Sequence, residues 1–212
     1  MDSIGDDRPT LREAQKQLTL AKLLDAARDV FHRKGYLAVT VDDIIDEAGV
    51  SRGTFYVYFR SKGEILSELF DTEHIAQVLA LLESFPAKPT IESLRAWLDR
   101  YFRLYSEQRL TIRAWIQAGS RETGLRDSSL EQMDRVLNVL SEKIAKVRDE
   151  HQLSVSSEEI RVRALLMFVQ MHEFAYYPYI RNYAVNESMG LSVLAELWYS
   201  AIFGLQTHPR DS

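Results

Sequence analysis

The chain contains no cysteine. This absence excludes a disulfide framework, a zinc site with thiolate ligands and a thiol nucleophile. Long apolar runs are also missing, since no segment reaches the roughly 20 apolar residues that a membrane-spanning helix needs. Residues 1–15 are polar and lack the apolar stretch of a secretory signal. We therefore expect a cytoplasmic protein without a membrane segment.

Proline and glycine are scarce, at five and nine of 212 residues, and no run alternates apolar and polar positions as a strand would. Apolar residues recur instead at intervals of three and four, which predicts an all-α fold of about nine helices. With 46% apolar residues, the chain can bury one sizeable core or two modest ones. In the C-terminal part we predict loops over 124–127 and 153–157, and helices over 90–107, 109–119, 128–151, 157–181 and 187–206.

The N-terminal part has clearer boundaries. We predict a disordered arm over residues 1–10 and then a first helix as far as Lys34, where Gly35 can end it. A later helix begins after Ser61 and extends to about Leu82. The stretch 84–90 follows it with two prolines and predicts a break in the helical structure.

Two short helices joined by a tight turn are predicted within residues 40–62. Thr40 can cap the first helix, Gly49 can end it in a left-handed conformation, and Ser51 can cap the second. A turn of this length that contains glycine is typical of a helix-turn-helix. The apolar face of the first helix comprises Val41, Ile44, Ile45 and Ala48, and that of the second comprises Phe55 and Phe59.

Charge is sorted between these two helices. Residues 51–63 contain three cations and no carboxylate, whereas Val41–Ala48 contains four acids and no cation. Arg52 can pair with guanine in the major groove, the hydroxyl side chains can bind phosphate, and Gly53 allows a close backbone approach. An ordinary helical hairpin with a solvated basic face is the alternative. The residues predicted to contact DNA are Thr40, Ser51, Arg52, Gly53, Thr54, Tyr56, Tyr58 and Lys62.

Two motifs cover this region. The first, F-x-x-x-G-Y, ends the first helix, and the second, A-G-V-S-x-G-T-x-Y-x-x-F, contains the turn. They comprise Phe31, Gly35 and Tyr36, and then Ala48, Gly49, Val50, Ser51, Gly53, Thr54, Tyr56 and Phe59. With Lys62 following, residues 20–66 resemble the DNA-binding domain of the TetR family of bacterial transcriptional repressors. Tyr58 and Gly63 depart from the family pattern, which often has a histidine and an acid at these positions.

The resemblance implies a domain organisation and a function. It implies a three-helix helix-turn-helix domain over residues 1–66 and a helical effector-binding and dimerisation domain over residues 67–212. It further implies a ligand-responsive repressor that binds a palindromic double-stranded operator as a homodimer and binds a small-molecule effector. From the residues themselves, a helical adaptor that binds protein rather than DNA remains an alternative.

Aromatic and methionine side chains are frequent after residue 90. Several fall at helical spacing, and for any one of them a place in the core is the simpler interpretation. A cavity between helices is the other, since such cavities are mostly apolar with few polar groups, and the resemblance implies an effector site here. The candidates for an apolar or aromatic effector are Trp97, Tyr101, Trp115, Met133, Leu137, Phe168, Met171 and His172.

The last predicted helix has a wide apolar face. One such face is needed for the protomer core, and its width suggests a second contact with another subunit. The resemblance implies that the last two long helices form a four-helix dimer interface. The residues predicted for it are Leu191, Leu194, Leu197, Trp198, Ala201 and Ile202.

Signals for catalysis are weak. The five histidines are scattered, and His172-Glu173 begins a zinc-protease motif that Tyr176 leaves without its second ligand. The sequence contains no G-x-S-x-G, P-loop or dinucleotide-binding glycine motif. We therefore expect no enzyme, no metal and no cofactor, although helical enzymes without such motifs remain an alternative.

Overall fold

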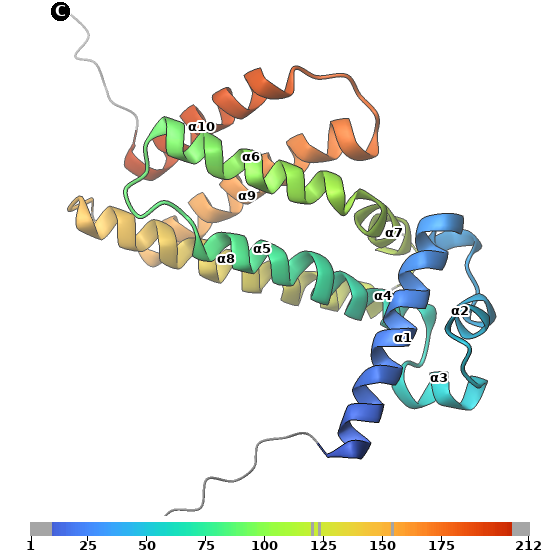
Figure 1. Cartoon of the computed structure of the whole chain (residues 1–212). Coiled ribbons are helices and arrows are strands. Elements are labelled where there is room, and N and C mark those ends of the chain that lie inside the picture. The colour runs from blue at the N-terminus through green and yellow to red at the C-terminus, as the bar shows by residue number, and fades with distance from the viewer. Residues whose placement is uncertain (1–9, 120, 123, 154, 205–212) are drawn as a thin grey trace, which may run out of the picture.

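The computed structural model describes residues 10–119, 121, 122, 124–153 and 155–204, and these residues contain helices and connections but no strand (Figure 1). The predicted all-α class is confirmed. The ten α-helices are α1 (Leu11–Lys34), α2 (Val41–Ala48), α3 (Arg52–Tyr58), α4 (Lys62–Phe70), α5 (Ala76–Glu83), α6 (Ile91–Glu107), α7 (Arg109–Gly119), α8 (Gly124–Glu150), α9 (Ser157–Ile180) and α10 (Glu187–Phe203).

Helix α4 continues into α5 without a break. The five residues between them, Asp71–Ile75, form a single π-helical turn whose flanking residues keep right-handed helical dihedrals. The two α-helices and the π turn therefore make one rod, so the described residues form nine helical rods, as the sequence predicted. Figure 1 shows this rod leading from the N-terminal helices into the larger C-terminal bundle.

Local capping explains the boundaries of the N-terminal helices. Thr10 and Glu13 form a capping box at the start of α1, and Gly35, with φ 73°, ends that helix. Thr40 and Asp43 form a second capping box, and Gly49, with φ 61°, ends α2 in the left-handed region. These helices enclose an apolar cluster built on Leu23, Phe31, Ile44, Phe55 and Leu66, to which α7 contributes Ala114 and Ala118.

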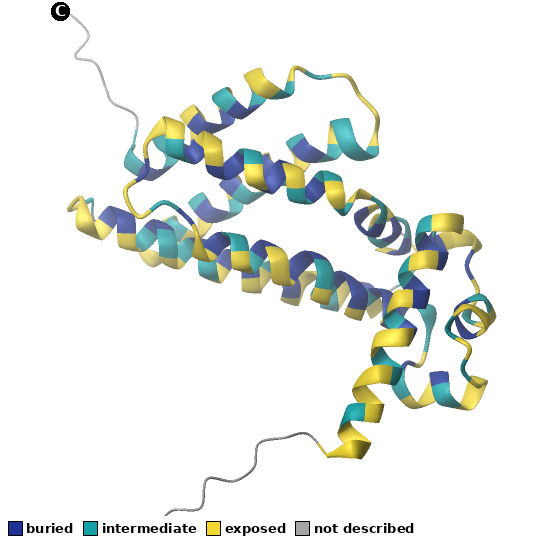
Figure 2. Cartoon of the chain, in the orientation of Figure 1, coloured by how far each residue is buried: buried dark blue, intermediate teal, exposed yellow. Residues whose placement is uncertain are grey.

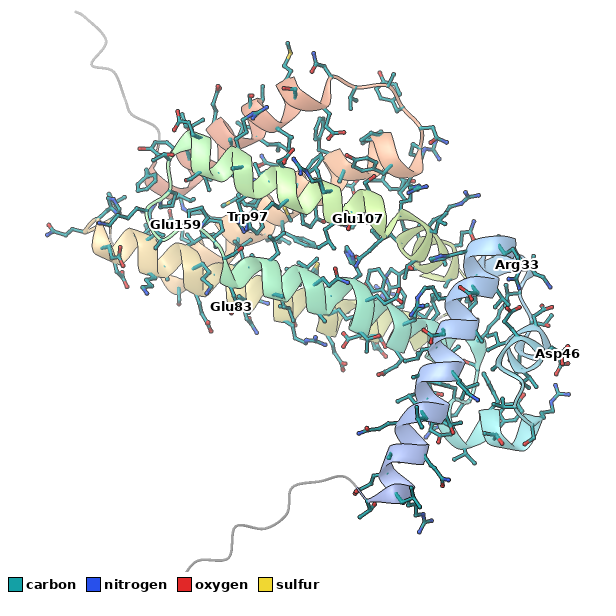
Figure 3. The ribbon with its side chains drawn as sticks, in the orientation of Figure 1. Arg33, Asp46, Glu83, Trp97, Glu107 and Glu159 are labelled. Carbon is teal, nitrogen blue, oxygen red and sulfur yellow. The ribbon has the colours of Figure 1, made fainter. Side chains whose placement is uncertain are left out.

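The C-terminal bundle has its own apolar cluster. Helix α6 packs along α10, and α8 packs along α9. Trp97, Tyr101, Phe102 and Trp198 are among the buried members, and Figure 3 shows Trp97 inside the bundle, whereas Arg33 and Asp46 lie on the outside of the N-terminal part. Gly190 allows α10 to approach α9, because a Cβ at that position would overlap the ring of Phe174.

Two predicted boundaries were wrong. The predicted loop over 124–127 is the first turn of α8, because Leu125 is buried in the N-terminal cluster and that contact outweighs the low helix propensity of Gly124. Helix α10 ends at Phe203 rather than at 206, because Gly204 adopts φ 89°; residues 205 and 206 lie outside the described part. Residues 1–9 of the predicted arm also lie outside it, and Thr10 caps α1.

None of the helices in the described ranges is both long enough and apolar enough to cross a bilayer.

Candidate nucleic-acid interface and ligand cavity

Helix α3 packs against the N-terminal apolar cluster on one face and is capped at its N-terminus. Phe55 is 0% exposed, and Phe59, which follows the helix, is also buried. The hydroxyl of Ser51 accepts a hydrogen bond from the backbone N–H of Thr54 at 3.0 Å, and the two hydroxyl oxygens lie 2.8 Å apart. The helix is therefore held rigidly at its N-terminal end, which is the end a reading helix presents to DNA.

The opposite face of α3 is open to solvent (Figure 2). Tyr56 is 49% exposed, and beyond the chain neighbours and the backbone of its own helix, the only described atom within 4 Å of a Cβ added at Gly53 is the Ser51 hydroxyl oxygen. The Arg52 side chain is 62% exposed, and its guanidinium lies 3.3 Å from the Asp42 carboxylate, itself 61% exposed. Exposed ion pairs of this kind contribute at most about 1 kcal/mol, so Arg52 can leave Asp42 for a stronger partner.

Two other predicted contact residues have internal partners. The Thr40 hydroxyl donates to the Asp43 carboxylate at 2.8 Å, and Lys34, 2.6 Å from the same carboxylate, holds the pKa of Asp43 well below its usual value. The Tyr58 hydroxyl donates to the backbone carbonyl of Lys16 at 3.2 Å. Tyr58, the last residue of α3, therefore links this helix to α1, whereas Thr40 caps α2.

Lys62, predicted to anchor phosphate, also has partners within the chain. Its ammonium donates to the carbonyls of Tyr36 at 3.1 Å and Val39 at 2.7 Å, and it lies 4.5 Å from the centre of the Tyr36 ring. These carbonyls belong to the short 3₁₀ helix Tyr36–Ala38 and the residue after it. Lys62 is therefore a clamp that joins the start of α4 to this turn.

A cavity of about 280 Å³ lies in the C-terminal bundle against the π turn. It is bounded by the α4–α5 rod, α7, α8 and α9. Among the predicted effector residues, Trp115, Met133, Phe168 and His172 line it. Its other walls include Phe70, His74, Val78, Ile112, Gln132, Val136 and Glu173.

The other four predicted effector residues do not line this cavity. Trp97 is buried and donates its indole N–H to the carbonyl of Leu81 at 3.0 Å. Tyr101 is buried behind the cavity wall, with its hydroxyl 3.5 Å from His172 Nδ1. Leu137 and Met171 belong to the apolar cluster of the bundle. In the structure these four residues pack within the apolar cluster of the bundle.

Sequence reasoning missed two polar residues of the cavity, His74 and Gln132. Both are nearly inaccessible, at 3% and 5% exposure. The available signal was a polar residue on an apolar helix face, since Gln132 falls in helical register with Leu125 and Val136. The amide oxygen of Gln132 is buried and has no hydrogen-bond partner among the described residues.

A chain of hydrogen bonds leads from the cavity to α1. His74 Nδ1 lies 2.6 Å from Gln108 Oε1, and the Gln108 amide N–H donates to the carbonyl of Glu73 at 2.8 Å. The Glu73 carboxylate in turn bonds Arg28 on α1 and accepts from Thr111 on α7 at 3.3 Å. The π turn, which holds both His74 and Glu73, therefore touches both the cavity and the N-terminal helices.

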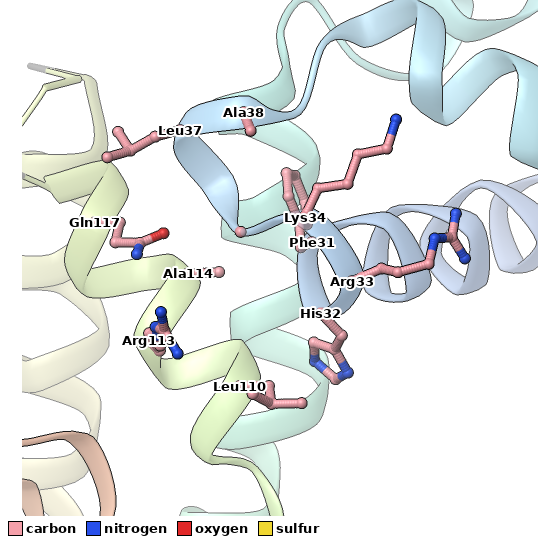
Figure 4. Close-up of a pocket in the computed structure, with 11 residues that line it drawn as sticks. Phe31, His32, Arg33, Lys34, Leu37, Ala38, Leu110, Arg113, Ala114 and Gln117 are labelled. Carbon is pink, nitrogen blue, oxygen red and sulfur yellow. The ribbon is translucent and has the colours of Figure 1, made fainter. Parts of the chain in front are cut away.

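A second, more polar pocket lies where α1 meets α7 (Figure 4). Its volume is about 260 Å³, and His32, Arg33, Lys34, Arg113 and Gln117 are among its lining side chains. Arg33 and Lys34 are already paired with Glu47 and Asp43 at 2.5 and 2.6 Å. This pocket marks the junction between the N-terminal helices and the bundle.

The predicted dimer residues are mostly core. Leu191, Leu194, Trp198 and Ile202 are buried within the protomer, and Ala201 is half-buried. The wide apolar stripe of α10 is needed because the helix packs against α6, α8 and α9 of its own chain. Only Leu197 of the predicted set is exposed. Exposed apolar residues instead follow one face of α9 and one of α10, namely Val162, Leu166, Val169, Met189, Val193 and Leu197.

Comparisons with known proteins identify relatives of this chain. A family model described as "Bacterial regulatory proteins, tetR family" matches residues 23–69. The HTH-type transcriptional regulator TtgR of Pseudomonas putida is 39% identical over 67 residues, which are 32% of this chain and 31% of TtgR. The match therefore spans about a third of that relative's length.

Similar solved structures extend over nearly the whole chain. A putative TetR-family regulator from Syntrophomonas wolfei has a TM-score of 0.74 at 18% identity, covering 92% of this chain and all of that one. FadR from Bacillus subtilis, solved in complex with stearoyl-CoA, has a TM-score of 0.65 at 21% identity, covering 87% and 98%. At these identities the structures show a shared fold.

Proposed function

Because this chain is a TetR-family transcriptional regulator, we propose that it is a ligand-responsive repressor whose α3 helix reads a palindromic operator. The main support for this proposal is the way α3 buries one face and exposes the other. Phe55 on its inner face is buried, whereas Arg52 and Gly53 at its capped N-terminus and Tyr56 one turn later are exposed. This arrangement supports a helix that enters the major groove of double-stranded DNA.

The contact residues have two roles in this proposal, base reading and phosphate binding. Arg52 reads a base, because a guanidinium can bond guanine O6 and N7 together. Ser51, Thr54, Tyr56 and Tyr58 position the helix through phosphate, with Thr40 beside them. The net charge of −5 does not oppose this, since counterion release depends on the phosphates contacted and not on the whole molecule.

We assign residues 1–66 to DNA binding and residues 67–212 to effector binding and dimerisation. The exposed apolar faces of α9 and α10 support a homodimer, since Leu166 and Leu197 remain 58% and 47% exposed in a single protomer. A two-fold axis there would present two α3 helices to successive half-sites, roughly 34–36 Å apart.

The effector would act through the α4–α5 rod. An apolar or aromatic ligand in the 280 Å³ cavity touches His74 and Phe70 on this rod, and the Glu73 contacts tie the same rod to Arg28 of α1. Ligand binding that shifts the π turn therefore changes the position of the N-terminal helices. A coupling of about 1–3 kcal/mol between the two sites is typical of such regulators.

The test begins with DNA fragments selected by the protein from a random duplex library. We expect tight binding by the wild-type protein and loss of binding by Arg52→Ala and Tyr56→Ala. Arg103→Ala is the matched control, because Arg103 is also an exposed arginine with an acidic partner, Asp99 at 2.6 Å, but lies on α6. Size-exclusion chromatography would report whether each variant retains its oligomeric state. Unchanged DNA binding by Arg52→Ala and Tyr56→Ala would refute the assignment of α3.

A further inference from the structure

Two aromatic pairs contribute to the walls of the 280 Å³ cavity. Phe70 and Trp115 stack in parallel, with ring centroids 4.5 Å apart and planes at 3°. On α9, the rings of Phe168 and His172 stack at 5.7 Å and 20°. Aromatic rings prefer offset-stacked or edge-to-face contact with such surfaces. The aromatic lining of the cavity thus favours an aromatic ligand over a flexible chain.

The cavity is also small. An apolar cavity of about 150 Å³ holds one benzene, so 280 Å³ has room for one or two rings with a substituent. A long acyl chain with its CoA group, such as the stearoyl-CoA bound by the structurally similar FadR, greatly exceeds this volume. The fold shared with FadR therefore does not imply that this chain binds the same ligand.

Hydrogen bonding determines which tautomer neutral His74 adopts. Gln108 uses its amide N–H to bond the Glu73 carbonyl, so the atom it turns to His74 is its oxygen. His74 Nδ1 must then carry the hydrogen, and neutral His74 presents Nε2 as an acceptor. No described residue donates a hydrogen bond to Nε2. The cavity wall thus offers an acceptor that a ligand can use.

Gln132 offers a second acceptor. Its amide oxygen is buried and accepts no hydrogen bond from any described residue, so a donor on a ligand would satisfy it. Burial lowers the pKa values of His74 and His172, so both imidazoles are neutral near pH 7. Among the described lining residues, Glu173 is the only carboxylate, and it is exposed. The interior therefore lacks a buried charge to pair with an ionic ligand.

We propose that the effector is a neutral aromatic hydrogen-bond donor of one or two rings, such as a phenol, an arylamine or an indole. Its ring lies against the aromatic walls, and its O–H or N–H donates to Gln132 Oε1 or His74 Nε2. The inference rests on the proposed function for its effect on DNA. Ligand binding itself is a separate property of the cavity.

The probe is 2-naphthol, compared with 2-methoxynaphthalene, which has the same rings but no O–H. Titration calorimetry on the wild-type protein without DNA should show 2-naphthol binding about tenfold more tightly. Gln132→Leu and His74→Phe remove the two acceptors one at a time. At least one of them should lower the affinity for 2-naphthol about tenfold while leaving that for the ether unchanged. Gln77→Leu, an exposed glutamine on α5 outside the cavity lining, is the matched control and should behave as wild type.

Equal affinities for the two probes, or no binding of 2-naphthol, would overturn the proposal. Retention of full 2-naphthol affinity by both acceptor variants would overturn it as well. The comparison of the two probes needs no variant, so a misfolded variant does not prevent the test. DNA release is measured separately: 2-naphthol that binds in calorimetry but leaves the DNA complex intact would confirm the ligand class and contradict effector-induced release.

Discussion

Acidification should destabilise the protein through His74. Burial lowers the pKa of this imidazole to about 4, against the opposing effect of its hydrogen bond to the Gln108 amide oxygen, whereas the unfolded chain has a value near 6.5. Between these values the unfolded state binds the proton and the folded state does not, so the stability present above pH 6.5 is lost as the pH falls toward 4. For one such group, the free energy of unfolding falls by about 2.5 kcal/mol between pH 7.5 and pH 4.5.

Urea unfolding at these two pH values measures this loss in the wild-type protein and in His74→Phe. Phenylalanine keeps the contact with the Phe70 ring, which lies 4.9 Å from the imidazole. It leaves Gln108 Oε1 unpaired, and that cost is the same at both pH values. The variant should therefore be less stable at pH 7.5 but should lose about 2.5 kcal/mol less on acidification. The pKa values of His32 and His172 are also lowered, and their contribution remains in both proteins. An identical pH dependence in the two proteins would refute the assignment to His74.

Three further substitutions test the structure. Lys62→Ala should lower the free energy of unfolding by about 2–3 kcal/mol in urea titrations, because it leaves two carbonyls without their hydrogen bonds and removes the contact with the Tyr36 ring. A loss of DNA affinity with unchanged stability would instead support Lys62 as a phosphate anchor. Gly190→Ala should destabilise by about 1–3 kcal/mol despite the better helix propensity of alanine, because its Cβ overlaps the Phe174 ring, and Phe174→Leu should partly restore stability. Gly53→Ala should raise thermal stability slightly, since its Cβ meets only ordinary contacts, and should weaken DNA binding in anisotropy titrations about tenfold. Unaltered DNA affinity would show that the backbone at this position stays clear of DNA.

Local signals in the sequence were sufficient to predict the helix-turn-helix. Thr40, Gly49 and Ser51 form the predicted caps and stop because each acts within three or four residues of its own position. The α8 start was missed for the opposite reason. Gly124 has a low helix propensity, and only the tertiary burial of Leu125 reverses it.

Residues that act over long sequence distances were harder to predict. Lys62 bonds carbonyls 26 and 23 residues away, and nothing local distinguishes that clamp from an exposed lysine. Apolar periodicity predicts which face of each helix is buried, but it does not predict where the packed faces enclose a cavity. For this reason the sequence did not distinguish Trp115 and Phe168, which line the cavity, from Trp97, which packs in the core. The same limit explains α10, whose wide stripe serves its own protomer.

The reading of DNA by α3 is tested most directly by the affinity ratio between a selected duplex and a scrambled one. Fluorescence anisotropy of wild type and Arg52→Ala across increasing salt gives this ratio and the salt slope together. We expect the wild-type ratio to exceed about 10³, with affinity falling linearly in log salt by about 0.9 per phosphate contacted. Arg52→Ala should lose most of the ratio and keep most of the slope, because a base contact carries sequence information and the phosphate contacts remain. Equal ratios in the two proteins, or a wild-type ratio near one, would contradict a reading role for α3.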